Sequence, residues 1–299
     1  MGWHYNDLDI YVSALYDVLD ETSYETANWF RVSQLGLIRS RPTVTRSTNN
    51  AEKKSVPGTI GELRSTVEQR SNAKIQFEIL VADAWPFASL KTSQNTLLQT
   101  VLNRALYLEQ VLYTAKRVAV KEQGHPTKEY YEVEDVAVEF NDADEKAAVL
   151  KCTMEVFPYI YDFSTNEKIV IAANGNQTVY NTLPYSECSP LYLFNGIGSA
   201  LANGNVRVRC SKNNVEISDY TMQIKSNIPS SVTGLVVDTK RMQAYDQSFL
   251  QSQSTDITPM NKYCYGDYDK LRIPANSTAI INNNTSAPLH FYMRRGLRI

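Results

Sequence analysis

The sequence predicts a mainly β protein with one helix. It divides into an N-terminal α+β domain over residues 1–163 and a C-terminal antiparallel β-sandwich over residues 164–299. A convincing helical periodicity occurs only once, between Ser93 and Thr114. After Tyr161 the chain consists of short strand-like runs separated by Asn, Gly, Pro and Ser, which is typical of antiparallel sandwiches. A chain of 299 residues is long enough for two domains.

The first predicted element with a clear pattern is an extended strand or long hairpin over residues 39–54. This segment is polar and β-branched and has no helical period, and we expect Asn49 and Asn50 at the tip of the hairpin. Pro57 and Gly58 then turn the chain, because proline presets φ and glycine tolerates positive φ.

The helix is predicted over residues 93–114. Ser93 is a suitable N-cap, because its side-chain oxygen can accept a free backbone N–H. Apolar side chains recur at three- and four-residue intervals, at Leu97, Val101, Ala105, Leu108 and Leu112. Such a stripe needs a sheet to cover, and alternating patterns predict strands over residues 74–81, 130–140 and 147–157.

The C-terminal half contains only strand signals. Short apolar or β-branched runs cover residues 169–172, 190–194, 206–210, 215–220, 235–238, 279–281 and 289–293. Asn and Gly pairs between them are turn signals, and the segment 212–214 joins two runs as a tight hairpin.

Composition and charge exclude several classes of function. The net charge is −2, so binding to nucleic acid through phosphate neutralisation is not expected. The four cysteines are far apart and form no CxxC pair, which predicts free buried thiols in a protein made in a reducing cytoplasm. The chain begins without a secretory signal pattern, and no apolar run approaches the length that spans a bilayer.

The sequence offers no catalytic, cofactor-binding or metal-binding constellation. Its three histidines are widely separated, so a shared metal site is not expected. Asp267 and Asp269 could supply a carboxylate pair for glycoside hydrolysis or oxygen ligands for calcium. Because Asp-x-Asp beside turn residues is usually a loop and is far shorter than a calcium-binding loop, we predict neither, and no enzyme.

Several weak motifs gain specificity from their order. The first half contains Val56-Pro57-Gly58 with Gly61, and Phe157-Pro158-Tyr159. The second half contains Ser189-Pro190-Leu191-Tyr192 leading into Gly196-Ile197-Gly198, then Val236-Val237-Asp238 followed by Tyr245, then Gly266-Asp267-Tyr268 descending to Pro274-Ala275-Asn276, and a last basic strand, Phe291 to Arg295. In this order the motifs resemble the distal tail proteins of phages with long non-contractile tails, over nearly the whole chain. Thr59 stands where that family usually has arginine.

The resemblance implies a structural hub. In that family a homohexameric ring of tail-tube-like N-terminal domains continues the tail tube and leaves a channel through which DNA passes. Galectin-like C-terminal sandwiches project outward to hold baseplate or receptor-binding proteins. The expected partners are therefore other copies of the chain, the tail tube protein and a tail-tip protein. The expected location is the tail tip or baseplate of the virion, after assembly in the host cytoplasm, with no cofactor and no membrane insertion.

The same resemblance assigns roles to particular residues. The predicted hairpin would reach the neighbouring subunit and contact it through Arg41, Val44, Arg46, Asn49, Asn50 and Lys53. Pro57, Gly58, Gly61 and Pro158 would form scaffold turns at the borders of the ring-forming half.

Two further clusters have a functional and a structural interpretation. Carboxylates at Glu132, Glu134, Asp135 and Glu139 either form a solvated strand face or line the ring's channel, where they would repel DNA phosphates. Tyrosines at Tyr263, Tyr265 and Tyr268 either contact a partner protein or a sugar, or strand alternation buries two of the three. An adhesion protein that binds cell-wall carbohydrate through the sandwich is the alternative function.

Overall fold

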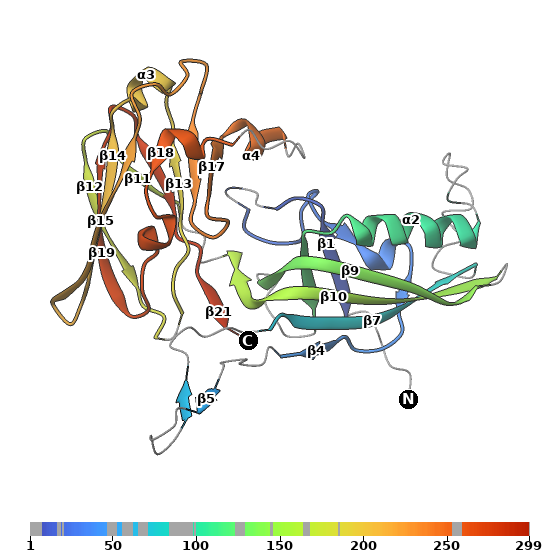
Figure 1. The fold of residues 1–299 in the computed structure, drawn as a ribbon. Helices are drawn as coiled ribbons and strands as arrows, with labels where there is room; N and C mark the ends of the chain where they lie inside the picture. The colour runs from blue at the N-terminus through green and yellow to red at the C-terminus, as the bar shows by residue number, and fades with distance from the viewer. Residues whose placement is uncertain are drawn as a thin grey trace. The chain divides into compact units, whose positions relative to one another are not determined.

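The computed structural model describes residues 8–16, 19, 21–46, 53–55, 62–64, 71–83, 98, 100–122, 129–143, 146–163, 168–184, 186–252 and 259–298 (Figure 1). The chain forms two compact units, which are described separately. The first contains Ser23–Ile160 and the strand that precedes it, and the second contains Tyr161–Arg298 and the short segment Asp17–Thr22. No helix among the described residues is long and apolar enough to cross a membrane.

The first unit is organised around a large antiparallel sheet with the strand order β2-β1-β8-β9-β10-β7-β3, and β4 also pairs with β7. The strands are β1 (Asp9–Ser13), β2 (Phe30–Arg31), β3 (Leu37–Ile38), β4 (Thr43–Thr45), β7 (Ala73–Ala82), β8 (Arg117–Lys121), β9 (Glu129–Ala143) and β10 (Ala147–Asp162).

The two long central strands of this sheet show why the sequence forms it. In β7 every second residue from Ala73 to Val81 is buried, and between them lie exposed or half-buried side chains. β10 alternates in the same way and pairs with β7 in continuous register from Ala147↔Ala82 to Val156↔Ala73. This alternation gives the sheet one apolar face, which another layer must cover.

The helix α2 (Val101–Tyr113) supplies that layer and lies along one face of the sheet in Figure 1. Its buried stripe joins the core of the sheet through Val101, Ala105, Leu108 and Leu112. The described helix begins after Thr100, whose side chain accepts a hydrogen bond from the backbone N–H of Asn103. The expected N-cap Ser93 lies outside the described residues.

The sheet curls into a half-barrel. Its terminal strands β2 and β3 are joined by the short 3-10 helix η2 (Val32–Gln34), so only six residue steps separate Arg31 from Leu37. Six steps span at most about 20 Å. A flat sheet with this strand order would place β2 and β3 about 29 Å apart. The short connection therefore requires the curl.

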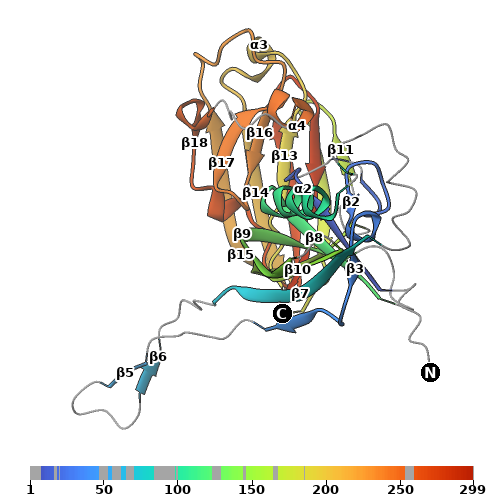
Figure 2. The same cartoon turned by 90° about the vertical axis from the view of Figure 1, so that its right-hand side faces the viewer.

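The predicted hairpin over residues 39–54 is wrong in its pairing. β4 pairs with β7, with Val44 opposite Ile75, and not with the segment that follows it. The hairpin instead joins β5 (Lys53–Ser55) to β6 (Glu62–Arg64), which form a two-stranded sheet of their own (Figure 2). The physical reason is the length of β7, because its edge offers every residue of β4 a backbone partner. Asn49, Asn50, Pro57, Gly58 and Gly61 lie outside the described residues.

The second unit consists of two antiparallel five-stranded sheets that enclose one apolar core. The first sheet has the order β11 (Lys168–Ile171), β20 (Leu289–Tyr292), β13 (Leu191–Phe194), β16 (Leu235–Asp238), β17 (Gln243–Asp246). The second has the order β12 (Asn176–Asn181), β19 (Ser277–Asn284), β14 (Asn205–Lys212), β15 (Val215–Ile224), β18 (Cys264–Tyr265). Inward side chains of both sheets meet in this core, which makes the unit a sandwich.

Local turn chemistry explains the tightest connection of the sandwich. Asn213 and Asn214 adopt φ values of 50° and 65° between β14 and β15. A type I′ turn requires positive φ at both central residues, and asparagine tolerates it. The remaining elements are short: α3 (Gly198–Leu201), α4 (Ser248–Ser252), η5 (Asn261–Tyr263), η6 (Tyr268–Leu271) and β21 (Gly296–Arg298). The predicted class, mainly β with one substantial helix, is confirmed.

Candidate assembly surfaces

The outermost strands β3 and β4 form an edge of the first unit that could pair with another chain. No described strand pairs with the outer side of either. All three residues of β4 are exposed, and the exposed fractions of Leu37 and Val44 are 37% and 38%. An unpaired edge with apolar side chains is a template for pairing with another chain, unless charge or proline protects it.

Two arginines, Arg39 and Arg41, flank this edge, and their charge restricts which strands can pair with it. Arg39 reaches Glu78 at 3.4 Å. Arg41 binds both carboxylate oxygens of Glu122, at 2.9 and 2.7 Å. Because Glu122 follows β8, which is several strands away in the sheet order, this ion pair ties the edge to the far part of the curled sheet. Positive charge is one way in which natural proteins keep an edge from pairing indiscriminately.

The other residues predicted in the inter-subunit segment are dispersed. Val44 and Arg46 are exposed at and just after β4, whereas Lys53 lies on β5 opposite Arg64. Pro158 is buried within β10 and is not in a turn, so its predicted role as a scaffold turn is wrong. An inter-subunit role for Arg41, Val44, Arg46 and Lys53 remains a prediction.

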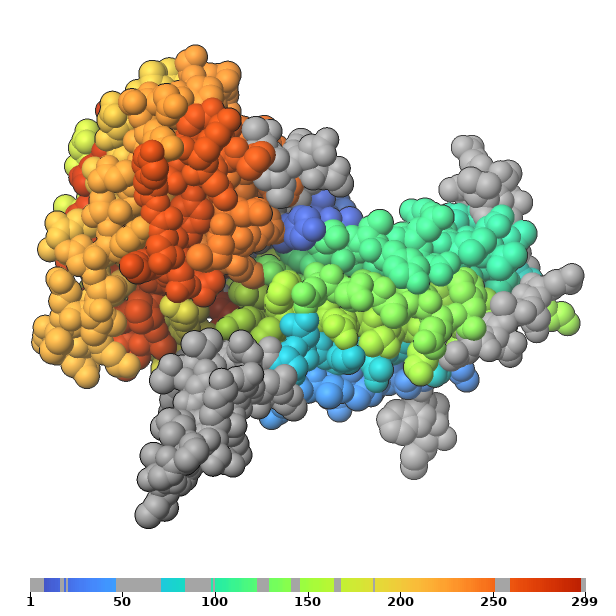
Figure 3. Space-filling model, in the orientation of Figure 1, coloured from blue at the N-terminus to red at the C-terminus, as the bar shows by residue number. Residues whose placement is uncertain are grey.

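The outer side of α2 is a second apolar surface. Leu102, Leu106 and Tyr113 are exposed by 53%, 41% and 49%, and their spacing places them along one side of the helix. Figure 3 shows α2 at the surface of the first unit. The sequence predicted the buried stripe of the helix and did not single out this second one.

The acidic cluster lies on β9, where Glu134, Asp135 and Glu139 are exposed and Glu132 is half-buried. Glu134 accepts a hydrogen bond from the side-chain amide of Asn72. Neighbouring residues of a strand point to opposite faces, so consecutive carboxylates of this cluster do not automatically share one surface. A channel-lining role for them stays a prediction.

The tyrosine cluster of the second unit does not form one surface. Tyr265 is 60% exposed, with the ammonium of Lys225 3.9 Å from its ring centroid. Tyr263 is half-buried, and Tyr268 is buried at 6% exposure. The suggested partner contact through Tyr268 is therefore wrong, because η6 turns its ring into the core. Burial raises the pKa of the Tyr268 hydroxyl, and its hydrogen bond with Cys264 adds to this effect.

The buried charged groups serve the fold. Asp238 and Arg294 form an ion pair in the second unit, with side-chain exposures of 0% and 4%. Burial opposes ionisation of Asp238, but the charge of Arg294 and its hydrogen bonds outweigh burial and lower the pKa of this carboxyl well below its usual range. Among the described residues no three metal-ligating side chains gather into a site.

Two buried arginines of the first unit were also missed. Arg104 donates to the carbonyl of Ala82 at 2.9 Å from within the buried stripe of α2. Arg117 packs against the rings of both Trp29 and Tyr130, at 4.6 and 5.4 Å from their centroids. The sequence carried one signal for the first: Arg104 occupies the same helical face as Val101 and Leu108.

These features define a class: a mainly β chain of two compact units whose most distinctive described surfaces are an open sheet edge and an apolar helix side. No protein-family model and no curated protein matches the sequence. Among solved structures, the chain is similar to one from the phage P2 baseplate in its activated conformation with Ca, with 10% identity, 96% of this chain and 97% of that chain covered, and a TM-score of 0.48. A second, from the phage p2 baseplate in its activated conformation with Sr, has 10% identity, coverage of 96% and 98%, and a TM-score of 0.46.

Proposed function

We propose that this chain is a structural component of a phage tail or baseplate, and specifically a distal tail protein that assembles with copies of itself. The observation that carries the proposal is the open edge formed by β3 and β4, with Leu37 and Val44 exposed on it. An enzyme would need a constellation of reacting groups, whereas the buried Asp238 and Arg294 pair with each other and the buried Arg104 donates to the carbonyl of Ala82.

The order of sequence motifs supports the same proposal. The motifs that resemble distal tail proteins extend from Val56 to Arg295 and cover both units. A half-barrel with one helix followed by a β-sandwich agrees with the two-part architecture that this resemblance implies.

The finer form of the proposal is a homohexameric ring. Its first units would continue the tail tube and surround a channel for DNA, and its sandwiches, galectin-like in this proposal, would hold tail-tip, baseplate or receptor-binding proteins. A ring requires head-to-tail contacts that close, and an edge strand with an exposed apolar side chain suits such a contact. Glu132, Glu134, Asp135 and Glu139 are the candidates for the channel wall, where negative charge would repel DNA phosphates.

The assembly is tested by measuring mass with light scattering and by imaging the purified chain by electron microscopy. A closed ring is expected for the wild type, and Val44→Asp should weaken the assembly about tenfold or more, because a charge placed in an apolar contact costs at least about 1.4 kcal/mol. The matched control is Val215→Asp, on the hairpin of the second unit, where Val215 is 65% exposed.

The outcomes separate two claims. A wild-type chain that stays monomeric at high concentration would refute the proposed function. A wild-type ring that Val44→Asp leaves intact would refute only the assignment of β4 as the contact strand.

A further inference from the structure

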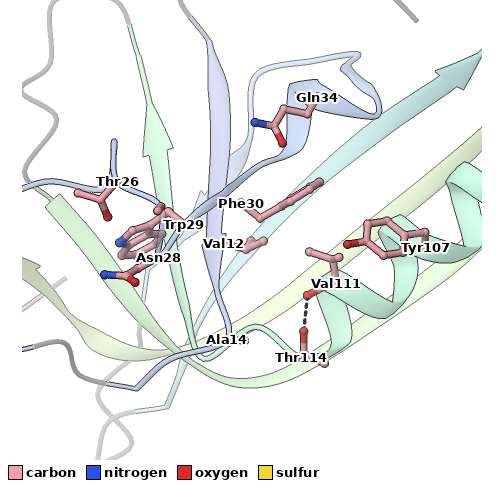
Figure 4. A pocket seen from close by; sticks show the side chains of 11 residues that line it. Val12, Ala14, Thr26, Asn28, Trp29, Phe30, Gln34, Tyr107, Val111 and Thr114 are labelled. Atoms are coloured by element: carbon pink, nitrogen blue, oxygen red, sulfur yellow. Dashed lines mark hydrogen bonds between the residues drawn. The ribbon is translucent and has the colours of Figure 1, made fainter. Parts of the chain in front are cut away.

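A pocket with a volume of about 540 Å³ opens on the first unit between β1, β2 and α2 (Figure 4). This volume lies within the range of about 300–1,000 Å³ that small-molecule sites occupy. The proposed assembly function gives this pocket no role.

The pocket follows from how the sheet and helix meet. Val12 on β1 and Phe30 on β2 are register partners, so both side chains point to the same face of the sheet, toward α2. The helix contributes Tyr107, Val111 and Thr114 at intervals of four and three residues, which places them on one side of the helix. Sheet and helix thus provide two facing walls.

The walls are aromatic and firmly held. The rings of Phe30 and Tyr107 lie edge to face, with centroids 6.5 Å apart and an interplanar angle of 70°. Trp29, at the side of the pocket, is fixed by the guanidinium of Arg117 at 4.6 Å. Tyr107 is 44% exposed, so part of its ring is available to a ligand.

The rim is polar but carries no charge. None of the eleven lining residues is acidic or basic. Asn28, Gln34 and Thr114 supply amide and hydroxyl groups, and the hydroxyl of Thr114 donates to the carbonyl of Val111 at 2.9 Å. The side-chain amide of Gln34 makes no hydrogen bond to another described residue, so both its donor and its acceptor groups are available.

This combination selects a class of ligand. Phosphates, carboxylates and ammonium groups are recognised by opposite charges, which the lining lacks. A purely apolar ligand would leave the side-chain amide of Gln34 unpaired and desolvated, at a cost. A sugar ring presents apolar C–H faces, which pack on aromatic rings, and hydroxyl groups at its edge, which pair with amides.

We propose that this pocket binds a neutral saccharide, with Phe30 and Tyr107 as the packing surface and the amide of Gln34 as the hydrogen-bonding group. The sequence had suggested saccharide contacts in the C-terminal sandwich, through Tyr265 and its neighbours. The geometry points to the first unit, where aromatic and amide groups converge on one cavity. The proposal does not depend on ring formation.

The test is a titration of the full chain with neutral oligosaccharides, namely cellobiose, maltose and N,N′-diacetylchitobiose, followed by calorimetry and saturation-transfer NMR. At least one should bind with a Kd below about 10 mM, a range that both methods reach. Tyr107→Ala should weaken binding at least tenfold, and Gln34→Ala several-fold. Tyr107 and Gln34 are both exposed, so neither change removes a core side chain.

Two controls make the result specific. Tyr113→Ala removes another exposed tyrosine of α2 outside the pocket and should leave the affinity unchanged. Tyr265→Ala tests the sandwich. Absence of binding by all three sugars would overturn the proposal. Binding that survives both pocket changes, or that is lost with Tyr265→Ala, would overturn it as well. A Tyr107→Ala change that alters oligomer mass but not sugar binding would show that another protein chain occupies the pocket, again contrary to the proposal.

Discussion

Removal of Arg294 should destabilise the second unit strongly, because it leaves the carboxylate of Asp238 buried without its main counter-charge. Arg294 approaches both carboxylate oxygens of Asp238 and also donates to the carbonyl of Ser189 at 3.0 Å. Breaking one side of a buried ion pair typically costs about 3–5 kcal/mol. The backbone N–H groups of Lys240 and Arg241 still bind Asp238, at 3.0 and 3.1 Å. We therefore expect Arg294→Ala to cost about 3 kcal/mol, near the lower end.

The assay is urea unfolding of the full chain, followed by circular dichroism, with the transition of the second unit resolved from that of the first. An exposed pair of the same chemistry provides the control. Arg207 and Asp219 form a two-pronged ion pair across β14 and β15, with side-chain exposures of 44% and 29%. Arg207→Ala should have a much smaller effect, because water screens exposed pairs. An Arg294→Ala cost no larger than that of Arg207→Ala would refute the reasoning.

The pH dependence of the same pair has a definite sign. The pKa of Asp238 is lower in the folded chain than in the unfolded chain, so the pair stabilises the fold above the unfolded pKa of about 3.9. That stabilisation is lost progressively as the pH falls from this value through the folded pKa. The difference in unfolding free energy between wild type and Asp238→Asn should therefore be constant from pH 7 to pH 5 and shrink below about pH 4.

Further predictions concern the first unit and the thiols. Arg117→Ala should cost about 2–4 kcal/mol in urea unfolding, since it removes the guanidinium that packs against Trp29 and Tyr130 and leaves the half-buried carbonyl of Leu15 without its hydrogen bond from Arg117. Arg117→Lys should not restore stability, because an ammonium lacks the planar stacking surface. Thr100→Ala should cost about 1 kcal/mol by removing the N-cap of α2, and Thr100→Ser should cost much less; equal losses would argue against capping. Native protein at pH 8 should not react with a thiol reagent within minutes, whereas urea-unfolded protein should react with four equivalents of the reagent. All four thiols are buried in the folded chain, and burial raises the pKa to about 12 at three of them, namely Cys152, Cys188 and Cys264. Rapid labelling of any native thiol would contradict that prediction.

The fold class was predictable because it depends on periodicity. The alternation of β7 and β10 and the apolar stripe of α2 each recur over many residues, so single exceptions do not obscure them. The pairing of short strands was not predictable in the same way. β4 has only three residues, and its partner was decided by the free edge of β7, which lies some thirty positions further along the chain.

The predicted sites were less accessible to sequence reasoning, for a physical reason. Burial of Tyr268 depends on the turn of η6, and that of Arg117 on two aromatic rings from distant segments. The pocket beside α2 combines β1, β2 and the helix, whose lining residues extend from Val12 to Thr114 in the sequence. Only tertiary structure brings such groups together, and it also decides that Tyr265 is exposed whereas Tyr268 is buried.

The measurement that tests the central claim most directly is the mass of the purified full chain, determined by light scattering and checked by electron microscopy of the same sample. The proposed hub predicts a closed ring with about six times the monomer mass of 33.8 kDa and a central opening. A single species of 33.8 kDa that persists as the concentration is raised would contradict it.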